Sequence, residues 1–417
     1  MEVNNQVKKL AIISSYNESC GNASYTEALR KEFTKYYDVD VLALKVSWLV
    51  SKNEKIHKLA DSHIEELCEK IKKYDYVNIQ FEAGLYGSHP NDIIKRVKKL
   101  IDSSKNLIFT MHRIDLEVSI FDKNVLKGFL SYDFISNLRN FWRQNYFPRV
   151  YSQLIKHIKN IKNKNIQIIV HTKKDCDTIK YAFDFDNVHD FPLTFLNGEE
   201  LHKYAQISDN NKFRNEYGLE QTDKIIGLFG FITDYKSHET AIKALRFLPE
   251  NYKIIIFGSQ HPMSITQYEK INPYLNHLLS EIEYKNSDEE EKTLHDRVLF
   301  AGNLGDEEFL KALHCVDYVV LPYLEVNQGG SGIASLAIET KAKTLFSNNK
   351  AFAELKRYFP DCFVSFDIGN YHELAYKIMN YRYNFESNID NCLKKYNIEE
   401  NIKFHKKLFE VGDMYEK

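Results

Sequence analysis

The repeated alternation of two patterns constrains the fold of this chain more than any other feature of its sequence. Short runs rich in β-branched and aromatic residues are each followed by a longer segment with helical spacing of apolar residues. Such alternation is typical of βαβ units, which place parallel strands side by side in one sheet. The runs form two sets: residues 9–15, 38–44, 74–82, 106–112 and 166–172, then residues 224–230, 252–258, 297–302, 317–323 and 342–348.

Each set contains about as many strands as one open doubly wound sheet needs, so the sequence predicts two such sheets. A chain of 417 residues also exceeds the size at which a single hydrophobic core stops growing. A proline and a glycine interrupt the periodicity between the sets, and we place the boundary near Pro192 to Gly198. We expect an N-terminal domain over residues 1–193, with a helical insertion at about 119–164, and a C-terminal domain over residues 194–395.

Charge and cysteine content narrow the class of protein. Lys+Arg 56 against Asp+Glu 58 leaves a net charge of -2, so the chain lacks the global positive field that would attract nucleic acid. The six cysteines are scattered without a CxxC pair, which favours reduced thiols in a cytoplasmic compartment over a metal site. No apolar run is long enough for a signal peptide or a membrane span, so we expect a cytoplasmic protein that does not cross a membrane.

Two glycines and a serine precede a helical pattern near residue 331, in the segment "QGGSGIASLAIETKAK". Ser331 is a good N-cap, and Gly332 and Glu339 share one face of the predicted helix. The face that packs on the sheet is predicted to carry Ile333, Leu336, Ala337 and Thr340.

The start of this helix is suited to an anion, because exposed N–H groups and the helix dipole both favour negative charge. A carboxylate such as Glu339, further along the same face, can accept two hydrogen bonds from a ribose diol. Together they predict a nucleotide diphosphate, with its phosphates at Ser331 and Gly332. The alternative is a loop that merely turns, with Glu339 as a surface charge.

A second strand, loop and helix lies in "GLFGFITDYKSHETAIKAL". Gly230 ends the strand, and Ser237 is predicted to cap the helix. Lys236, one residue before that cap, is well placed to neutralise a leaving diphosphate. The alternative is a solvated loop lysine.

These segments, taken together and in order, resemble the retaining nucleotide-sugar glycosyltransferases of the large bacterial family four. The resemblance is carried by "GFITDYKSHETAIKALRFL", "IIIFGSQHP", the region from "GNLGDEEF" to "KTLFSN", "VNIQFEAGLYG" and "TMHRID". It implies a GT-B fold, with two Rossmann-like domains facing across a cleft, and a terminal helix at 396–417 that crosses back onto the first domain. It also implies a hexosyltransferase that needs no metal or other cofactor and moves sugar from a nucleotide-diphosphate donor to a glycan, lipid-linked or protein acceptor. A role in bacterial surface polysaccharide or glycoconjugate synthesis is expected.

The resemblance also assigns roles to individual residues. His112 matches a histidine that touches the donor sugar, and Lys236 matches a phosphate-binding lysine. Gly21 matches a glycine loop after the first strand, where Ser24 and Glu27 are predicted to form a capping box. The donor-binding set it implies is Gly21, Gly230, Lys236, Gly258, Leu304, Ser331, Gly332, Ile333 and Glu339.

Two positions depart from the family's pattern. Ser331 stands where many members have a second glutamate that contacts the donor sugar, which leaves the sugar's identity open. Thr233 stands where many have an arginine, so full neutralisation of the phosphates would depend on Arg113 or Lys173. These departures motivate a rival interpretation, a sugar-nucleotide-binding partner without activity. A nucleotide-sugar epimerase of the same fold is a further alternative.

Four further features have two interpretations each. Glu82, at a strand's carboxyl end, either orients an acceptor hydroxyl or is structural. His171 lines the site or is a satisfied core histidine, and Asp184 and Asp186 form either a metal-binding DxD or a solvated loop. Residues 142–164 combine aromatic and basic side chains, which suits either peripheral contact with the inner face of a membrane or a solvated helix.

Overall fold

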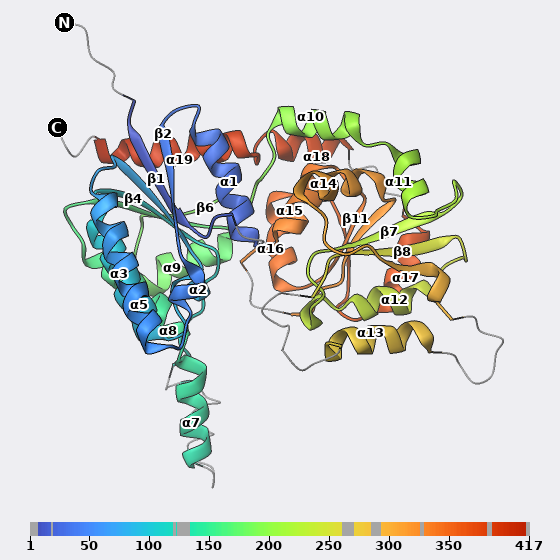
Figure 1. The fold of residues 1–417 in the computed structure, drawn as a ribbon, viewed down its shortest axis with the longest axis horizontal. Helices are drawn as coiled ribbons and strands as arrows, with labels where there is room; N and C mark the ends of the chain where they lie inside the picture. Colours follow the sequence, from blue (N-terminus) through green and yellow to red (C-terminus); the bar gives the residue numbers. More distant parts are fainter. Residues whose placement is uncertain are drawn as a thin grey trace, which may run out of the picture. The chain divides into compact units, whose positions relative to one another are not determined.

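The computed structural model describes residues 7–17, 20–119, 122, 134–260, 271–284, 293–325, 329–381 and 386–413. The chain forms two compact units, the first from Met1–Leu193 with Ile398–Lys417 and the second from Thr194–Asn397. Each unit contains one six-stranded sheet in which every strand pair is parallel (Figure 1). The two parallel sheets predicted from the alternating pattern are therefore confirmed.

The sheet of the first unit has the strand order β2-β1-β3-β4-β5-β6. Its strands are β1 (Lys9–Ser14), β2 (Asp38–Ala43), β3 (Tyr76–Phe81), β4 (Asn106–Met111), β5 (Asn165–Val170) and β6 (Val188–Asp190). Its helices are α1 (Gly21–Phe33), α2 (Val46–Leu49), α3 (Glu54–Ile71), α4 (Ala83–Tyr86), α5 (Pro90–Ser103), α7 (Phe134–Asn145), α8 (Pro148–Asn160), α9 (Lys173–Phe183) and α19 (Ile398–Asp413).

The two faces of this first sheet differ in chemistry. One face packs its apolar side chains, such as Ile79, Phe109 and Ile168, into a core with α3, α5 and α8. The other face carries amides and hydroxyls, because Asn78, Gln80 and Thr110 alternate with those apolar residues along their strands.

Helix α19 lies against the polar face, together with α1 (Figure 1). The side chain of Asn106 donates to the Phe409 carbonyl at 2.9 Å, and that of Asn165 donates to the Leu408 carbonyl at 2.9 Å. Asn401, on α19, donates to the Tyr25 hydroxyl at 3.0 Å. Buried amides need such partners, so these contacts tie the terminal helix to the polar face of the sheet.

The sheet of the second unit has the order β12-β11-β10-β7-β8-β9. Its strands are β7 (Lys224–Phe229), β8 (Tyr252–Phe257), β9 (Val298–Phe300), β10 (Tyr318–Leu321), β11 (Thr344–Ser347) and β12 (Val364–Phe366). Its helices are α10 (Gly198–Ile207), α11 (Asn210–Glu216), η1 (Asp234–Lys236), α12 (His238–Leu245), α13 (Pro273–Glu283), η3 (His295–Arg297), α14 (Asp306–Cys315), α15 (Gly332–Glu339), α16 (Lys350–Tyr358), α17 (Tyr371–Met379) and α18 (Glu386–Leu393).

Short polar side chains begin many of these helices by accepting a hydrogen bond from a backbone N–H in the first turn. In α10 the cap is a full capping box, with Asn197 and Glu200 each bonded to the other's backbone N–H. A single N-cap, in which the side chain accepts a backbone N–H of the first turn, is formed by Asn53, Thr172, Asp209, Asn272, Asn349 and Asn370.

The structure corrects the sequence prediction at several places. Strands β6 (VHD) and β12 (VSF) were not predicted, because polar residues interrupt their short runs, whereas the equally short β9 (VLF) is apolar and was predicted. The predicted insertion contains α7 and α8, while residues 120–121 and 123–133 within it lie outside the described residues. On α15 the face buried on the sheet is Ala334, Ala337 and Ile338, whereas Ile333 and Leu336 are half-buried, so the predicted face is wrong by about one residue.

Candidate functional site

Two glycines at the carboxyl ends of β7 and β8 allow a close approach in the second unit. Gly230 has a φ of +89°, and a Cβ atom there would lie 2.3 Å from Lys236 Nζ and 2.5 Å from Ile333 Cδ1. A Cβ atom at Gly258 would lie 2.1 Å from the Gly230 carbonyl oxygen. Glycine is therefore required at both positions, and four of the candidate donor residues, Gly230, Lys236, Gly258 and Ile333, meet here.

The ammonium group of Lys236 is buried at this junction. The residue is only 5% exposed, and Nζ donates one long hydrogen bond, 3.3 Å, to the Phe229 carbonyl. Nζ also lies 5.7 Å from the centre of the Tyr323 ring. No carboxylate in the described part of the chain pairs with it, and burial lowers the pKa of Lys236 to about 7. The predicted alternative of a solvated loop lysine is therefore wrong.

The backbone that carries Lys236 is locally strained. Ser237 has φ 49° and ψ 47°, which is the left-handed region that a non-glycine residue rarely adopts. Its hydroxyl contacts Thr240 Oγ1 at 2.7 Å and Glu239 Oε1 at 3.0 Å, and it accepts no backbone N–H, so the predicted N-cap at Ser237 is wrong. Strain of this kind clusters at ligand-binding turns, which fits a turn shaped to aim the lysine.

The hydroxyl oxygen of Thr233 is also buried, and it has no hydrogen-bond partner within the described residues. Thr233 brings no charge to the turn. The two cations considered as substitutes already have carboxylate partners, because Arg113 pairs with Asp115 at 2.8 Å and Lys173 pairs with Asp177. Within the second unit, the cation that the structure places at this turn is Lys236.

Ser331 is the N-cap of α15, as the sequence predicts, and its hydroxyl accepts the Ala334 N–H at 3.3 Å. The first turn holds no acidic residue, so the positive end of the helix dipole is not neutralised from within. A Cβ atom at Gly332 would lie 3.0 Å from the Phe195 ring, so the helix start packs closely on the segment that opens this unit.

Glu339 is buried at the far end of α15, with 3% of its surface exposed. Its two carboxylate oxygens accept the backbone N–H groups of Phe195 at 2.9 Å and Leu196 at 3.3 Å. The surface-charge alternative for Glu339 is therefore wrong. The carboxylate ties residues 195–196 to α15 and thereby fixes the ring that packs beside Gly332.

Leu304 is a cavity-lining residue, and its neighbour Asn303 accepts the Ser259 N–H at 3.1 Å beside Gly258. The cavity, of about 300 Å³, is formed with residues of α11 and α14, and none of the other candidate donor residues lines it. The structure thus brings Gly230, Lys236, Gly258 and Ile333 together in the second unit, and no contact between Leu304 and these four residues is recorded within the described residues.

In the first unit, His112 belongs to a chain of buried hydrogen bonds on the polar face of the sheet. Its Nε2 lies 2.8 Å from Gln80 Oε1, and its Nδ1 lies 3.1 Å from His171 Nε2. His171 Nδ1 in turn lies 3.0 Å from the Phe191 carbonyl oxygen. The ring of Tyr25 packs edge-on against both imidazoles, with centroids 5.6 Å away in each case.

This chain couples the protonation of the two histidines to the orientation of Gln80. The pair makes three contacts: one with the Gln80 side-chain oxygen, one with the Phe191 carbonyl oxygen, and one between the two rings. Each contact needs one N–H group, whereas two neutral imidazoles supply only two. Burial opposes a charge here, because it lowers the pKa of His171 to about 4 and lowers that of His112 well below its usual range. Reversing the Gln80 amide together with that of Asn78, whose Oδ1 accepts from Gln80 Nε2, turns the Gln80 NH₂ group toward His112 and satisfies the neutral pair. His171 is thus a hydrogen-bonded core residue.

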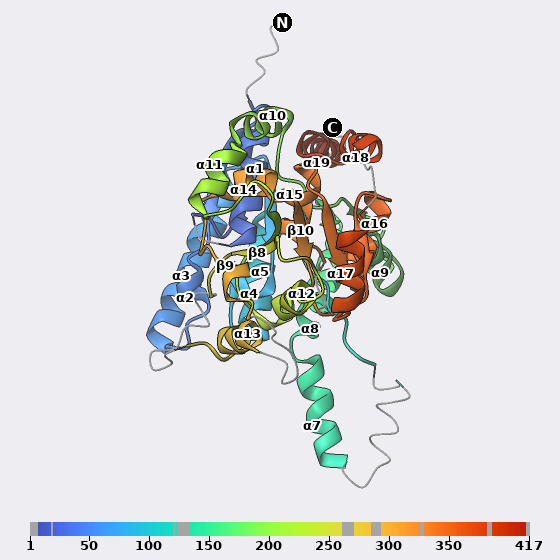
Figure 2. The same ribbon diagram turned by 90° about the vertical axis from the view of Figure 1, so that its right-hand side faces the viewer.

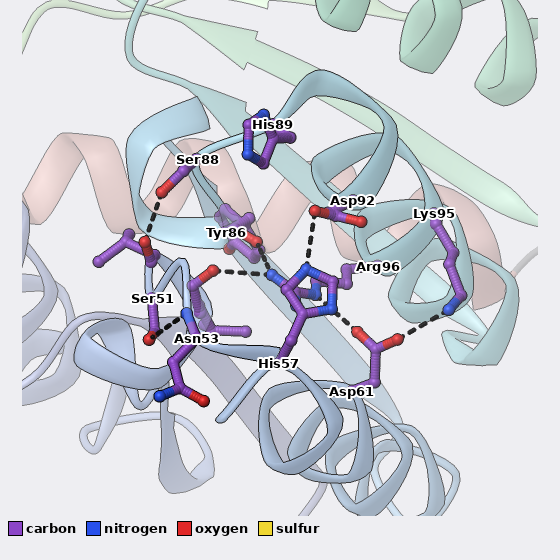
Figure 3. A network of polar contacts seen from close by, with 12 residues as sticks. Ser51, Asn53, His57, Asp61, Tyr86, Ser88, His89, Asp92, Lys95 and Arg96 are labelled. Atoms are coloured by element: carbon purple, nitrogen blue, oxygen red, sulfur yellow. Dashed lines mark hydrogen bonds and ion pairs between the residues drawn. The ribbon is translucent and has the colours of Figure 1, made fainter. Parts of the chain in front are cut away.

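Glu82 follows β3 and precedes α4, and its side chain is half-buried without capping that helix. Burial raises the pKa of its carboxyl group, partly offset by Arg113. The loop that carries it is fixed by the Tyr86 hydroxyl, which donates to the Gln80 carbonyl at 2.9 Å. The Arg96 guanidinium donates to the Tyr86 carbonyl at 3.0 Å and is held by Asp61 at 2.9 Å (Figure 3).

Gly21 begins α1, with open space where a side chain would lie. The N-cap of this helix is Cys20, so the capping box predicted for Ser24 and Glu27 is wrong. Glu27 binds instead to the Arg30 guanidinium at 2.7 and 2.8 Å.

The described residues contain no group of three or more histidine, cysteine, aspartate or glutamate side chains that could hold a metal ion. Asp184 pairs with Lys159 at 2.9 Å, and Asp186 lies 3.7 Å from Lys180, so both carboxylates of the DxD-like segment have cationic partners. No helix among the described residues has the length and apolar character needed to cross a bilayer.

Solved structures share this fold across nearly the whole chain. HepE from Anabaena in complex with UDP-glucose has a TM-score of 0.59 and 12% identity, over 96% of this chain and 99% of that chain. A glycosyltransferase from Rickettsia africae ESF-5 has a TM-score of 0.63 and 11% identity, over 97% and 98%. Sucrose-phosphate synthase from Thermosynechococcus elongatus has a TM-score of 0.63 and 13% identity, over 97% and 98%.

These neighbours have the GT-B fold, and their similarity confirms the predicted fold class for this chain. No protein-family model matches the chain, and no curated protein matches it in sequence. Identities at this level show the fold alone, so the chemistry must be argued from the residues above.

Sequence reasoning missed one residue in each unit, Tyr323 in the second and Gln80 in the first. Tyr323, whose ring faces the Lys236 ammonium, lies in "DYVVLPY" and carries no sequence signal beyond following a strand. The sequence does carry a pattern that points to Gln80, because "YVNIQF" alternates amide and apolar residues along a strand whose six residues are all buried. Such alternation indicates a strand with one polar, hydrogen-bonded face.

Proposed function

We propose that this protein is a glycosyltransferase that uses a nucleotide-diphosphate sugar as its donor. The observation that carries the proposal is the buried ammonium of Lys236, without a carboxylate partner in the described residues, at the carboxyl ends of β7 and β8. A buried cation in that position is costly unless an anion binds to it. The fold neighbour HepE, crystallised with UDP and with UDP-glucose, supports a nucleotide sugar as that anion.

The donor's diphosphate would be bound by Lys236 and by the N–H groups at the start of α15. This binding is geometrically supported by the close approach of Gly230, Lys236 and Ile333. Glu339 is proposed as the ribose ligand, in addition to its bonds to residues 195–196. The roles of Gly21 and Leu304 in donor binding remain predictions from the sequence.

The proposed reaction retains the anomeric configuration. The bond between the sugar's anomeric carbon and the diphosphate breaks, the acceptor oxygen bonds to the same face of that carbon, and the acceptor's proton passes to the departing phosphate oxygen. Lys236 would stabilise the negative charge that grows on the leaving diphosphate. The interaction between the ammonium and the diphosphate would therefore be stronger in the transition state than in the ground state. His112 and Glu82, in the first unit, keep their predicted roles at the transferred sugar and the acceptor hydroxyl.

Two rival functions differ in what becomes of the donor. We would incubate the protein with a panel of nucleotide-diphosphate sugars, with and without glycan, lipid-linked and protein acceptors, and measure free nucleotide diphosphate. Release that requires an acceptor supports transfer, and NMR of the product's anomeric proton then reports whether configuration is retained. Conversion of the sugar without release would instead show an epimerase. Binding without either would show an inactive partner protein, the function favoured by Thr233 and Ser331.

We further propose that turnover needs no metal, because a lysine and backbone N–H groups meet the phosphates. Activity is expected to survive exhaustive treatment with EDTA. Loss of activity that manganese or magnesium restores would overturn the metal-independent mechanism. The proposed setting is the cytoplasm of a bacterium that builds surface polysaccharide or glycoconjugates.

A further inference from the structure

Two of the chain's six cysteines lie side by side in the second unit, although all six are free thiols in the structure. Cys362 lies in the turn between α16 and β12, and Cys392 lies in the last turn of α18. The two residues are 30 positions apart in sequence, yet their Sγ atoms are 3.8 Å apart. A disulfide bond needs a separation of about 2.0 Å, so a small movement would bring the two sulfurs to bonding distance.

Aromatic contacts hold the two segments together. The ring of Tyr396, which follows α18, packs edge-on against the rings of Tyr358 at 5.3 Å and Phe359 at 5.9 Å between centroids. The N–H of Tyr396 also donates to the Cys392 carbonyl at 2.9 Å, so the position of this ring fixes that of Cys392. Groups held together in this way react with one another far more readily than two separate molecules would.

The two thiols differ in their access to solvent. Cys362 is 0% exposed, whereas Cys392 is partly exposed. Burial and the neighbouring Cys392 raise the pKa of the Cys362 thiol. The exposed residues Lys394 and Lys395 follow Cys392 and would attract a negatively charged reagent. A dissolved oxidant therefore meets Cys392 first, and Cys362 reacts through Cys392.

We propose that Cys362 and Cys392 are a site of reversible oxidation, at which glutathione disulfide converts the two thiols into an intrachain disulfide. First, the Cys392 thiol loses its proton to the solvent, and its sulfur attacks one sulfur of glutathione disulfide, which expels one glutathione. Next, Cys362 loses its proton, its sulfur attacks Cys392 Sγ, and the second glutathione leaves. Two protein thiols are oxidised while one glutathione disulfide is reduced to two molecules of glutathione. This modification does not depend on the proposed transfer of sugar.

The disulfide would fix the segment by which the chain leaves the second unit. Helix α18 is followed by α19 (Figure 2), and the second unit ends at Asn397. One contact of α18 in the reduced chain is the ion pair of Asp390 with Lys341 at 2.6 Å, in which both side chains are 49% exposed. Ion pairs so exposed contribute little to stability. A covalent bond from Cys392 to the turn before β12 would therefore strengthen the attachment of α18 considerably.

Peptide mapping tests the pairing directly. We would incubate the full-length protein with glutathione disulfide, block the remaining thiols, digest it with trypsin and analyse the peptides by mass spectrometry. The peptides that contain Cys362 and Cys392 should be joined, with the mass of two hydrogen atoms lost. Reduced glutathione in excess should separate them again.

Variants separate the two steps of the reaction. Cys362→Ser should keep glutathione on Cys392, because no second thiol displaces it, and Cys362→Ala provides the same measurement if the serine variant does not fold. Cys392→Ser should leave Cys362 reduced. The matched control is Cys20→Ser, since Cys20 is also partly exposed but its Sγ contacts the Ser15 hydroxyl at 3.2 Å. The joined peptides should form in this control as in wild type.

Thermal unfolding measures whether the bond fixes α18. The oxidised protein should melt about 5–10 °C above the reduced protein, because the cross-link restricts the unfolded chain. The Cys362→Ser and Cys392→Ser variants should show no such shift on treatment with glutathione disulfide.

Three results would contradict the proposal. In the first, glutathione stays on Cys392 of the wild type and no joined peptides appear, so the two thiols do not meet. In the second, the joined peptides come only from two copies of the chain, as a non-reducing gel would show. In the third, the oxidised protein melts at or below the temperature of the reduced protein, so the bond strains the second unit instead of fixing α18. None of these measurements depends on catalytic activity.

Discussion

Replacing Lys236 by methionine should have opposite effects on stability and on donor binding. Lys236 has a folded pKa of about 7, while an unfolded lysine titrates near 10.4. A lysine whose pKa is lower in the folded state than in the unfolded state lowers the free energy of unfolding. This penalty is complete at pH values below the folded pKa, and it shrinks as the pH rises toward the unfolded pKa. At pH 7 the penalty is about 4 kcal/mol, so we expect Lys236→Met to raise the free energy of unfolding by about 2–4 kcal/mol.

The same substitution removes the cation proposed to hold the diphosphate. A hydrogen bond to a charged group contributes about 1.5–3 kcal/mol, so the dissociation constant for a bound donor should rise by about tenfold to a hundredfold. Urea denaturation at pH 7 and at pH 10 measures the first effect, which should shrink at the higher pH, and calorimetry with UDP-glucose measures the second.

The matched control is Lys253→Met. Lys253 lies on β8 and pairs with Asp223 at 3.1 Å, so its replacement should lower stability slightly and leave donor binding unchanged. If Lys236→Met lowers the free energy of unfolding, as the control Lys253→Met does, then Lys236 is a structural lysine and the reasoning from its burial is refuted.

Three further predictions follow from the same geometry. Because the bound diphosphate should keep Lys236 protonated, affinity for UDP-glucose should fall about tenfold between pH 6 and pH 8, with proton uptake in calorimetry; affinity that is flat over this range contradicts it. Glu339→Gln places an amide NH₂ against the N–H of Phe195 or its neighbour, so urea denaturation should show a loss of about 1–3 kcal/mol beside weaker binding, and a variant as stable as wild type would contradict the clamp. His171→Phe removes the hydrogen-bond partner of His112 and should lower kcat about tenfold to a hundredfold with donor affinity unchanged. His171→Gln should restore part of the rate. Equal rates for the two variants would show that His171 does not position His112.

The two sheets could be predicted because their strands are strongly patterned. Runs such as residues 106–111 and 224–229 are almost continuously apolar, which is the expected pattern for a parallel strand buried on both faces. Strand β6 was missed because two of its three residues are polar and Pro192 follows it so closely that the segment resembles a linker. Strand β12 has a serine in the middle of its three residues, whereas the equally short β9 is wholly apolar and was predicted.

The candidate site was only partly predictable, because its decisive contacts join residues distant in sequence. The spacing on one helix suggested a role for Glu339, but not its bonds to residues 195–196, which lie 144 and 143 positions away. The approach of Gly258 to Gly230 depends on the pairing of β7 with β8. Burial of Lys236 follows from the side chains around it, and no local pattern encodes that burial.

A co-crystal structure with UDP tests the central claim most directly, since the claim places a diphosphate beside Lys236 and the start of α15. We predict phosphate oxygens within about 3 Å of Lys236 Nζ and of backbone N–H groups near Gly332, with the ribose diol at Glu339. UDP bound instead in the cavity that Leu304 lines, with Lys236 Nζ still bound to the Phe229 carbonyl and far from any phosphate, would contradict the account.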